Sequence, residues 1–161
     1  MRKKSLIIRN PISGPKSNKF IVDKLEAKFK TLNINYEILQ TEYKGHAELI
    51  CANKEILLYE NIIICGGDGT FNEVINGLIK NHQFNIPTIG FLPGGTGNAF
   101  MHDLEATNPD EAIDLIINKN EKKIDVLQLN FKKNIEYSIN IVGWGMVTDI
   151  LILSEKMRFL R

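Results

Sequence analysis

The sequence predicts an α/β fold in which a parallel sheet is covered by helices on both faces. Short β-branched or apolar runs recur at residues 5–9, 34–40, 61–65 and 88–92, and segments with helical spacing lie between them. These runs are too uniformly apolar for either side to face water, which is typical of strands in a covered parallel sheet. Strands and helices are therefore expected to alternate along this part of the chain.

The first helix is predicted at residues 17–32, because apolar residues recur there near one face. Residues 46–54 and 70–80 show similar spacing over shorter lengths. In the first helix the apolar residues expected to share a face are Phe20, Leu25, Phe29 and Leu32.

A fourth helix is predicted at residues 108–119. Asn108 is placed as its N-cap, Pro109 takes the first helical position, and Glu111 completes a capping box. Two strand-like runs follow between residues 122 and 142, separated by a polar KKN turn. We expect these runs to form an antiparallel pair.

Composition narrows the class of protein. A length of 161 residues with 43% hydrophobic residues fits one domain of ordinary size with a sizeable core. Because 20 Lys and Arg stand against 19 Asp and Glu, no long-range field is available to hold a nucleic acid, and any phosphate contact must be local.

Targeting signals and cysteine chemistry have little support in the sequence. No run approaches the roughly 18 apolar residues of a membrane-spanning helix, and the apolar stretch near the start is too short for a signal peptide.

Cys51 and Cys65 show neither redox nor metal-ligand spacing, so a reduced, cytosolic compartment is the default. Cys65 ends an apolar run and is expected to be a buried small hydrophobe.

Four loops follow the four predicted strands, where the carboxyl edge of the sheet should lie. Glycine lets backbone amides approach a ligand, and the start of a following helix adds partial positive charge, so together they suit phosphate. The first to fourth loops are residues 9–16 (RNPISGPK), 40–47 (QTEYKGHA), 66–73 (GGDGTFNE) and 92–100 (LPGGTGNAF).

Each glycine-rich loop also has a plainer explanation. Tight turns from strand to helix need glycine in any case, and Thr70 with Glu73 could simply form a capping box. Three such loops at one edge nevertheless favour phosphate binding. Because neither the P-loop pattern nor G-x-G-x-x-G occurs, a P-loop ATPase and an NAD dehydrogenase are disfavoured.

Asp68 is a lone carboxylate in the third loop. A polyphosphate beside it would repel it by several kcal/mol unless a metal ion or a hydroxyl proton lay between them. Two roles fit: accepting the proton of an attacking alcohol, or helping to hold Mg²⁺. Asp68 is therefore predicted to be a phosphotransferase carboxylate.

These motifs resemble those of the diacylglycerol kinase, sphingosine kinase and ceramide kinase superfamily of lipid kinases. GGDGTFNEV matches the GGDGTxNEV signature, NPISG resembles N-P-x-S-G, Thr41 with KGHA resembles T…GHA, and LPGGTGNAF resembles P-x-G-T-G-N. The resemblance implies a three-layer Rossmann-like parallel sheet, like the N-terminal domains of NAD kinase and diacylglycerol kinase. It implies an ATP-binding catalytic domain at residues 1–122 and the start of a truncated, β-rich, lipid-binding domain at residues 123–161.

The resemblance also implies a set of site residues that would use ATP and Mg²⁺. Asp68 would be catalytic. No residue is assigned as a metal ligand, since in the diacylglycerol kinase branch those ligands belong to the second domain. The nucleotide-binding residues would be Asn10, Pro11, Ile12, Ser13, Gly14, Thr41, Gly66, Gly67, Asp68, Gly69, Thr70, Phe71, Asn72, Thr96 and Arg158. The three histidines are expected to have ordinary surface or capping roles, and His46 is singled out only because it lies in the second loop, which is expected to face the nucleotide.

The implied activity is transfer of the γ-phosphoryl group of ATP to a hydroxyl of a diacylglycerol or sphingoid-type lipid, by a cytoplasmic enzyme peripheral to the membrane. Two alternatives stay open. One is an NAD kinase or another small-molecule kinase with the same core, although Asn72 and Glu73 after the Gly-Asp-Gly-Thr favour the lipid kinases. The other is a non-catalytic nucleotide-binding fragment, because such kinases are about twice this length.

The closing segment, residues 143–160, resembles the sphingosine and ceramide kinase branch, yet the lipid stays open. Leu151 stands where sphingosine kinases carry an aspartate for the sphingoid amine, and Arg161 stands where the family usually has glycine. This segment is too apolar to be fully solvated, so further chain or a partner chain is expected to cover it, with a homodimer as one such assembly.

Overall fold

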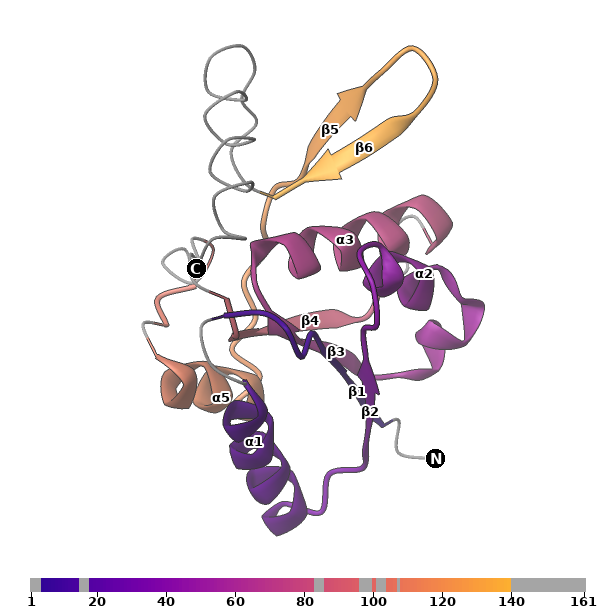
Figure 1. The fold of residues 1–161 in the computed structure, drawn as a ribbon. Helices are drawn as coiled ribbons and strands as arrows, with labels where there is room; N and C mark the ends of the chain where they lie inside the picture. Colours follow the sequence, from indigo (N-terminus) through magenta and orange to yellow (C-terminus); the bar gives the residue numbers. More distant parts are fainter. Residues whose placement is uncertain are drawn as a thin grey trace.

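The computed structural model describes residues 4–14, 18–82, 86–95, 100, 104–106 and 108–139. These residues form an α/β fold in which a parallel sheet lies between two helical layers, with a separate antiparallel pair beside it (Figure 1). The predicted fold class is confirmed.

The sheet contains β1 (Ser5–Arg9), β2 (Tyr36–Gln40), β3 (Asn61–Gly66) and β4 (Thr88–Pro93), all parallel and in the order β2-β1-β3-β4. All five residues of β1 are buried, and it has a neighbour on each side. The four predicted strands are confirmed, with ends that shift by at most two residues.

The helices are α1 (Lys19–Thr31), α2 (His46–Ala52), α3 (Asp68–His82) and α5 (Pro109–Ile117), and a 3₁₀ helix, η1 (Lys54–Leu58), follows α2. Figure 1 shows α1 and α5 on one face of the sheet and α2 and α3 on the other. Within the part of the chain that the structure describes, no helix combines the length and the apolar character needed to cross a membrane.

The apolar face predicted for the first helix is wrong at two positions. Phe20 and Leu32 are 55% and 47% exposed. The buried stripe follows the spacing of i, i+3 and i+4, and Phe20 is displaced from it by one residue, or about 100° around the helix. The buried residues of α1 are Ile21, Val22, Leu25 and Phe29.

Helix α5 begins as the sequence predicts. Asn108 Oδ1 accepts hydrogen bonds from the backbone N–H groups of Asp110 and Glu111, each at 3.0 Å, and Pro109 is the first helical residue. The predicted N-cap and proline position are confirmed.

Helices α2 and α3 pack closely at Gly77. A methyl group at this position would lie 2.3 Å from the carbonyl oxygen of Glu48 and 2.9 Å from Cβ of Cys51. Both Cys51 and Cys65 are completely buried, which confirms the prediction for Cys65.

Strands β5 (Leu127–Asn130) and β6 (Ile135–Ser138) form the predicted antiparallel pair. The pair is held on α3 by Asn76, whose Oδ1 accepts from the backbone N–H of Tyr137 at 2.9 Å and whose Nδ2 donates to the carbonyl of Tyr137 at 2.8 Å. Lys80 of α3 adds ion pairs to Glu48 and to Glu136 of β6, at 3.2 and 2.8 Å. Helix α3 therefore carries the hairpin.

Candidate functional site

The strand order creates a switch point between β1 and β3. The chain leaves β1 toward β2 on one side and leaves β3 toward β4 on the other, so the connections that follow β1 and β3 diverge. In open α/β sheets, ligands bind in the crevice formed at this point, outside the carboxyl ends of the strands. The first and third loops lie there.

Backbone hydrogen bonds bring the starts of all four loops together at this edge. The N–H of Asn10 donates to the carbonyl of Cys65, and the N–H of Thr41 donates to the carbonyl of Arg9, both at 2.9 Å. The N–H of Gly94 donates to the carbonyl of Gly66 at 2.8 Å. The edge is thus one continuous surface made from four separate parts of the sequence.

Asn10 joins the first loop to α3. Its Nδ2 donates to Oγ1 of Thr70 at 2.9 Å, while its Oδ1 accepts from the backbone N–H of Ile12 at 3.2 Å. Its carbonyl oxygen accepts from Oγ of Ser13 at 2.9 Å. Asn10 and Thr70, two of the predicted nucleotide-binding residues, therefore already contact each other across the switch point.

Asn18 braces the same loop and was missed in the sequence. It is 2% exposed, and its Nδ2 donates to the carbonyl of Asn10 and to Oγ of Ser13, both at 2.8 Å. Its Oδ1 accepts from Nε of the buried Arg9 at 2.8 Å. The available signal was a polar residue directly before α1, but such a residue is expected to cap the helix, and the side chain of Asn18 makes no cap hydrogen bond.

Helix α3 begins at Asp68, so the capping-box interpretation of Thr70 and Glu73 is wrong. Thr70 already lies in the first turn, where its hydroxyl accepts from Asn10. Glu73 Oε1 instead accepts from the backbone N–H of Gly45 at 2.9 Å, and so holds the start of α2. The reason is that the helix starts two residues earlier than a cap at Thr70 requires.

The first turn of α3 suits an anion. The first intrahelical hydrogen bond in the third loop runs from the N–H of Phe71 to the carbonyl of Gly67 at 3.1 Å. In a helix, the N–H groups before this point have no intrahelical acceptor, and the helix dipole adds partial positive charge. Backbone N–H groups and this charge together favour phosphate or carboxylate.

The glycines of the third and fourth loops differ in what surrounds them. A methyl group on Gly66 would lie 2.8 Å from Cβ of Thr70, and one on Gly94 would lie 2.8 Å from Nδ2 of Asn18. Close packing therefore favours glycine at both positions, against Thr70 within the same loop at Gly66 and against Asn18 and the third loop at Gly94. Gly69, in contrast, is exposed, and a methyl group there would meet no atom of the described residues within 4 Å. As far as these residues show, open space lies at the first turn of α3.

Asp68 stands beside that space as the first residue of α3. Its Oδ1 accepts from the backbone N–H of Phe100 in a long contact of 3.5 Å. Among the described residues, no group of three or more His, Cys, Asp or Glu side chains is placed to hold a metal ion. Mg²⁺ needs no such group, because it commonly binds one or two carboxylates together with water and substrate phosphates.

The remaining predicted residues fall into different environments. The ring of Phe71 is buried against Phe91 and Phe100, with centroids 5.0 and 4.8 Å away, so this side chain packs in the core. The side chain of Ile12 is exposed. Asn72 Oδ1 is buried and has no hydrogen-bond partner among the described residues, which marks it as an acceptor for a group outside them.

Two predicted contacts lie outside the described residues, namely Thr96 and Arg158. The other predicted nucleotide-binding residues occupy the first and third loops or, for Thr41, the start of the second. Thr41 is buried, at 8% exposure.

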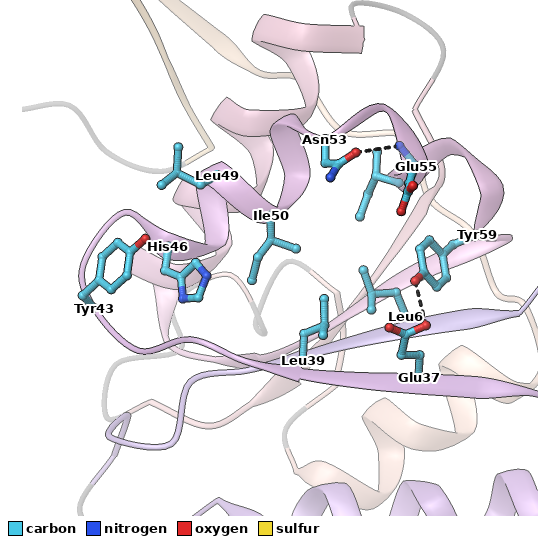
Figure 2. Close-up of a pocket in the computed structure, with 11 residues that line it drawn as sticks. Leu6, Glu37, Leu39, Tyr43, His46, Leu49, Ile50, Asn53, Glu55 and Tyr59 are labelled. Carbon is cyan, nitrogen blue, oxygen red and sulfur yellow. Dashed lines mark hydrogen bonds between the residues drawn. The ribbon is translucent and has the colours of Figure 1, made fainter.

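The second loop also borders a pocket of about 290 Å³ between β2 and the layer formed by α2 and η1 (Figure 2). The ring of His46 stacks on Tyr43, with centroids 4.6 Å apart, and its Nδ1 accepts from the backbone N–H of Glu42. At the other end, the Tyr59 hydroxyl donates to Glu37. None of the described residues that line this pocket belongs to the first or third loop. His46 thus lines a cavity separate from the switch point.

The two thiols do not supply nucleophiles to the site. Burial raises the pKa of both Cys51 and Cys65 to about 12, and the nearby Arg9 offsets only part of the rise at Cys65. Both thiols therefore stay protonated at neutral pH, and a protonated thiol is a poor nucleophile and a poor metal ligand.

The chain matches the diacylglycerol kinase catalytic domain family over residues 4–129. It is 30% identical to sphingosine kinase 1 of Arabidopsis thaliana, over 98% of this chain and 34% of that protein. It is 35% identical to a diacylglycerol kinase of Bacillus subtilis, over 92% of this chain and 48% of that protein. The chain thus spans about a third to a half of the length of these relatives.

A solved structure shares the fold. The crystal structure of a diacylglycerol kinase from Bacillus anthracis str. Sterne aligns with a TM-score of 0.65 and 34% identity, over 77% of this chain and 45% of that chain. The switch point and the glycine-rich third loop are consistent with this sequence match. This chain therefore belongs to the diacylglycerol kinase catalytic domain family.

Proposed function

We propose that the chain is the nucleotide-binding part of an ATP-dependent lipid kinase, which transfers the γ-phosphoryl group to a hydroxyl of a diacylglycerol or sphingoid-type lipid. The family supports the reaction class. The observation that carries the assignment of the site is the first turn of α3, where Asp68 stands beside the open space at Gly69. In this reading residues 1–122 form the catalytic domain and residues 123–161 begin the lipid-binding domain.

The residues of the switch point fit a nucleotide. The N–H groups of the first turn of α3 would bind phosphate oxygens, and Asn10 and Thr70 would hold the first and third loops in register around them. Asn72 Oδ1, a buried acceptor with no partner among the described residues, fits a ligand that offers a hydroxyl or amine donor. Thr41, Thr96 and Arg158 complete the proposed set.

Asp68 would act on the lipid hydroxyl. Its carboxylate would accept the proton of the attacking alcohol and orient that oxygen toward the phosphoryl group. Mg²⁺, when bound, supplies positive charge that compensates both the phosphates and this carboxylate.

The test is Asp68→Asn, which keeps the shape of the side chain and removes its capacity to accept a proton. We expect ADP binding by calorimetry to persist and transfer of labelled phosphate from ATP to be lost. Asp110→Asn is the matched control, because Asp110 also lies in the first turn of a helix but is exposed on α5. Transfer at the unmutated rate by Asp68→Asn would contradict the role.

The acceptor is tested with diacylglycerol, ceramide, sphingosine and NAD in parallel. Phosphorylation of either kind of lipid supports the proposal and names the substrate class. Phosphorylation of NAD alone would assign the chain to another kinase class. Nucleotide binding with transfer to none of the four would indicate a nucleotide-binding module.

A further inference from the structure

We propose that the tip of the β5–β6 hairpin, residues 131–135, docks on an anionic lipid bilayer. The choice of this occupant rests on the proposed lipid substrate. The location rests on the hairpin itself, which projects from the layered body of the fold beside α3 (Figure 1).

Apolar side chains at and near the tip are exposed. Phe131 is 58% exposed and Ile135 on the other side of the turn is 45% exposed, while Leu127, which is 53% exposed, lies at the far end of β5 from the turn. Singly, such residues need no explanation, but here they gather on one short hairpin. An aromatic ring at a projecting tip can enter the boundary between headgroups and acyl chains.

Two lysines occupy the turn between these apolar residues. Lys132 and Lys133 are exposed, and the N–H of Phe131 donates to the carbonyl of Asn134 at 2.9 Å, which closes the turn around them. Lysine carries its charge at the end of a long apolar stem, so it can reach anionic headgroups while a neighbouring ring is inserted. The combination fits an anionic membrane better than a neutral one.

The nearby acidic group does not cancel this charge. Glu136 of β6 pairs with Lys80 of α3 at 2.8 Å and accepts from Nδ2 of Asn134 at 2.9 Å. Lys80 also pairs with Glu48, so the charge of Glu136 is compensated in part from the side of the helix, and two lysines in the turn still outnumber this one carboxylate. The turn keeps a local excess of positive charge, although the chain as a whole is nearly neutral, with a formal charge of +1.

The hairpin is also anchored to the element that begins with Asp68. Asn76 holds the backbone of Tyr137 by two hydrogen bonds, and Lys80 holds Glu136, both from α3. A tip that rests on a bilayer would thus fix the orientation of α3, and with it the proposed active site, relative to the membrane. For an enzyme that acts on a lipid, this orientation would direct the proposed active site toward its substrate in the membrane.

The experiment is sedimentation of the chain with vesicles of phosphatidylcholine alone or mixed with phosphatidylserine. Lys132→Gln with Lys133→Gln is expected to weaken binding to the mixed vesicles by about 25-fold, since each lysine near an anionic surface contributes about fivefold. Phe131→Ala is expected to weaken binding to both kinds of vesicle by about tenfold. Added salt should weaken the unmutated chain more than the double lysine variant.

Matched controls come from α1 on the far face of the sheet. Phe20→Ala removes a ring of similar exposure, 55%, and Lys28→Gln with Lys30→Gln removes the same charge from exposed positions. Both should bind vesicles like the unmutated chain. The tip variants and Phe20→Ala should unfold at nearly the same temperature as the unmutated chain, because the altered side chains are exposed. The α1 lysine variant should unfold slightly lower, because Lys28 and Lys30 lie in the last turn of the helix, and its vesicle binding is measured well below that temperature.

Three results would overturn the proposal: no binding of the unmutated chain to either vesicle, unchanged binding by the tip variants, or equal losses in the α1 controls. Phosphate transfer to detergent-dispersed diacylglycerol is measured separately. Vesicle binding that depends on the tip, without phosphate transfer, would support the docking surface and contradict the proposed kinase function. Phosphate transfer without vesicle binding that depends on the tip would support the proposed kinase function and contradict the docking surface.

Discussion

Asn10 Nδ2 donates to Thr70 Oγ1 over 2.9 Å, so one hydrogen bond closes the gap between the loop after β1 and the helix after β3. Thr70→Val keeps the size and branching of the side chain and removes the acceptor. We expect the free energy of unfolding to fall by about 1–2 kcal/mol, because Asn10 loses a partner in a mostly buried setting. Urea titration measures the loss, and calorimetry with ADP should show weaker binding.

Thr88→Val is the control for this change. The hydroxyl of Thr88 donates to Glu121 at 3.2 Å on the exposed start of β4, so its removal should change stability by less than about 0.5 kcal/mol. If Thr70→Val and Thr88→Val lowered the free energy of unfolding equally, the hydrogen bond between Asn10 and Thr70 would stabilise the fold no more than an exposed one.

Gly66 and Gly69 should respond in opposite ways to alanine. Gly66→Ala is expected to destabilise the fold by about 1–3 kcal/mol, since the new methyl group meets Thr70 at 2.8 Å. Gly69→Ala fills open space on a helix and should leave stability unchanged or raise it by about 0.5–1 kcal/mol. If a phosphate occupies that space, Gly69→Ala should still weaken ADP binding, and a stable variant with full ADP affinity would argue against this site.

Asn76 should control how firmly the hairpin is attached. Asn76→Ala removes both hydrogen bonds to Tyr137 and is expected to cost about 2 kcal/mol. Hydrogen exchange of the Tyr137 amide should accelerate by a larger factor than exchange in β1. Asn81→Ala, which removes only a bond within α3 to the carbonyl of Gly77, should change neither quantity appreciably.

Alkaline pH should destabilise the fold through the buried thiols. The pKa of Cys51 and Cys65 rises from a usual 9.0 to about 12 in the folded chain, so above pH 9 only the unfolded chain loses these protons. Stability is therefore unaffected by the thiols below pH 9 and falls between pH 9 and about 12, by about 1.4 kcal/mol per pH unit for each thiol. The slope should be smaller in Cys65→Ala, and an unchanged slope would contradict the assignment.

The strands could be predicted because the residues within each strand determine its structure. Runs such as that in β3 are β-branched and apolar, and burial on both faces leaves few other structures for them. The roles of Asn108 as N-cap and Pro109 as first helical residue could also be predicted, since a cap and its helix are adjacent in sequence. The error at Phe20 arose because neighbouring apolar residues compete for one stripe of α1, and only packing decides between them. The error at Leu32 arose because α1 ends at Thr31, so Leu32 is the C-cap and lies outside the helix.

The connections within the candidate site were not predictable in the same way. Glu73 holds Gly45 from 28 residues away, and Asn76 holds Tyr137 from 61 residues away. A side-chain amide or carboxylate can satisfy many backbone groups, so the sequence does not select among distant partners. The sequence predicted that the loops would follow the strands at one edge of the sheet, and the described parts of these loops lie together there. That this edge is the functional site, and that Asp68 and the other residues act in catalysis and binding, stay predictions.

The central position of β1 has a consequence for how the chain acquires its fold. This strand is made before both of its partners, β2 and β3, which end at residues 40 and 66. Contacts between distant segments slow folding because the intervening chain must be closed into loops before they form. During synthesis, the apolar β1 must therefore wait without its second neighbour until β3 has left the ribosome, and a chaperone that shields Leu6, Ile7 and Ile8 in that interval would raise the yield of folded protein.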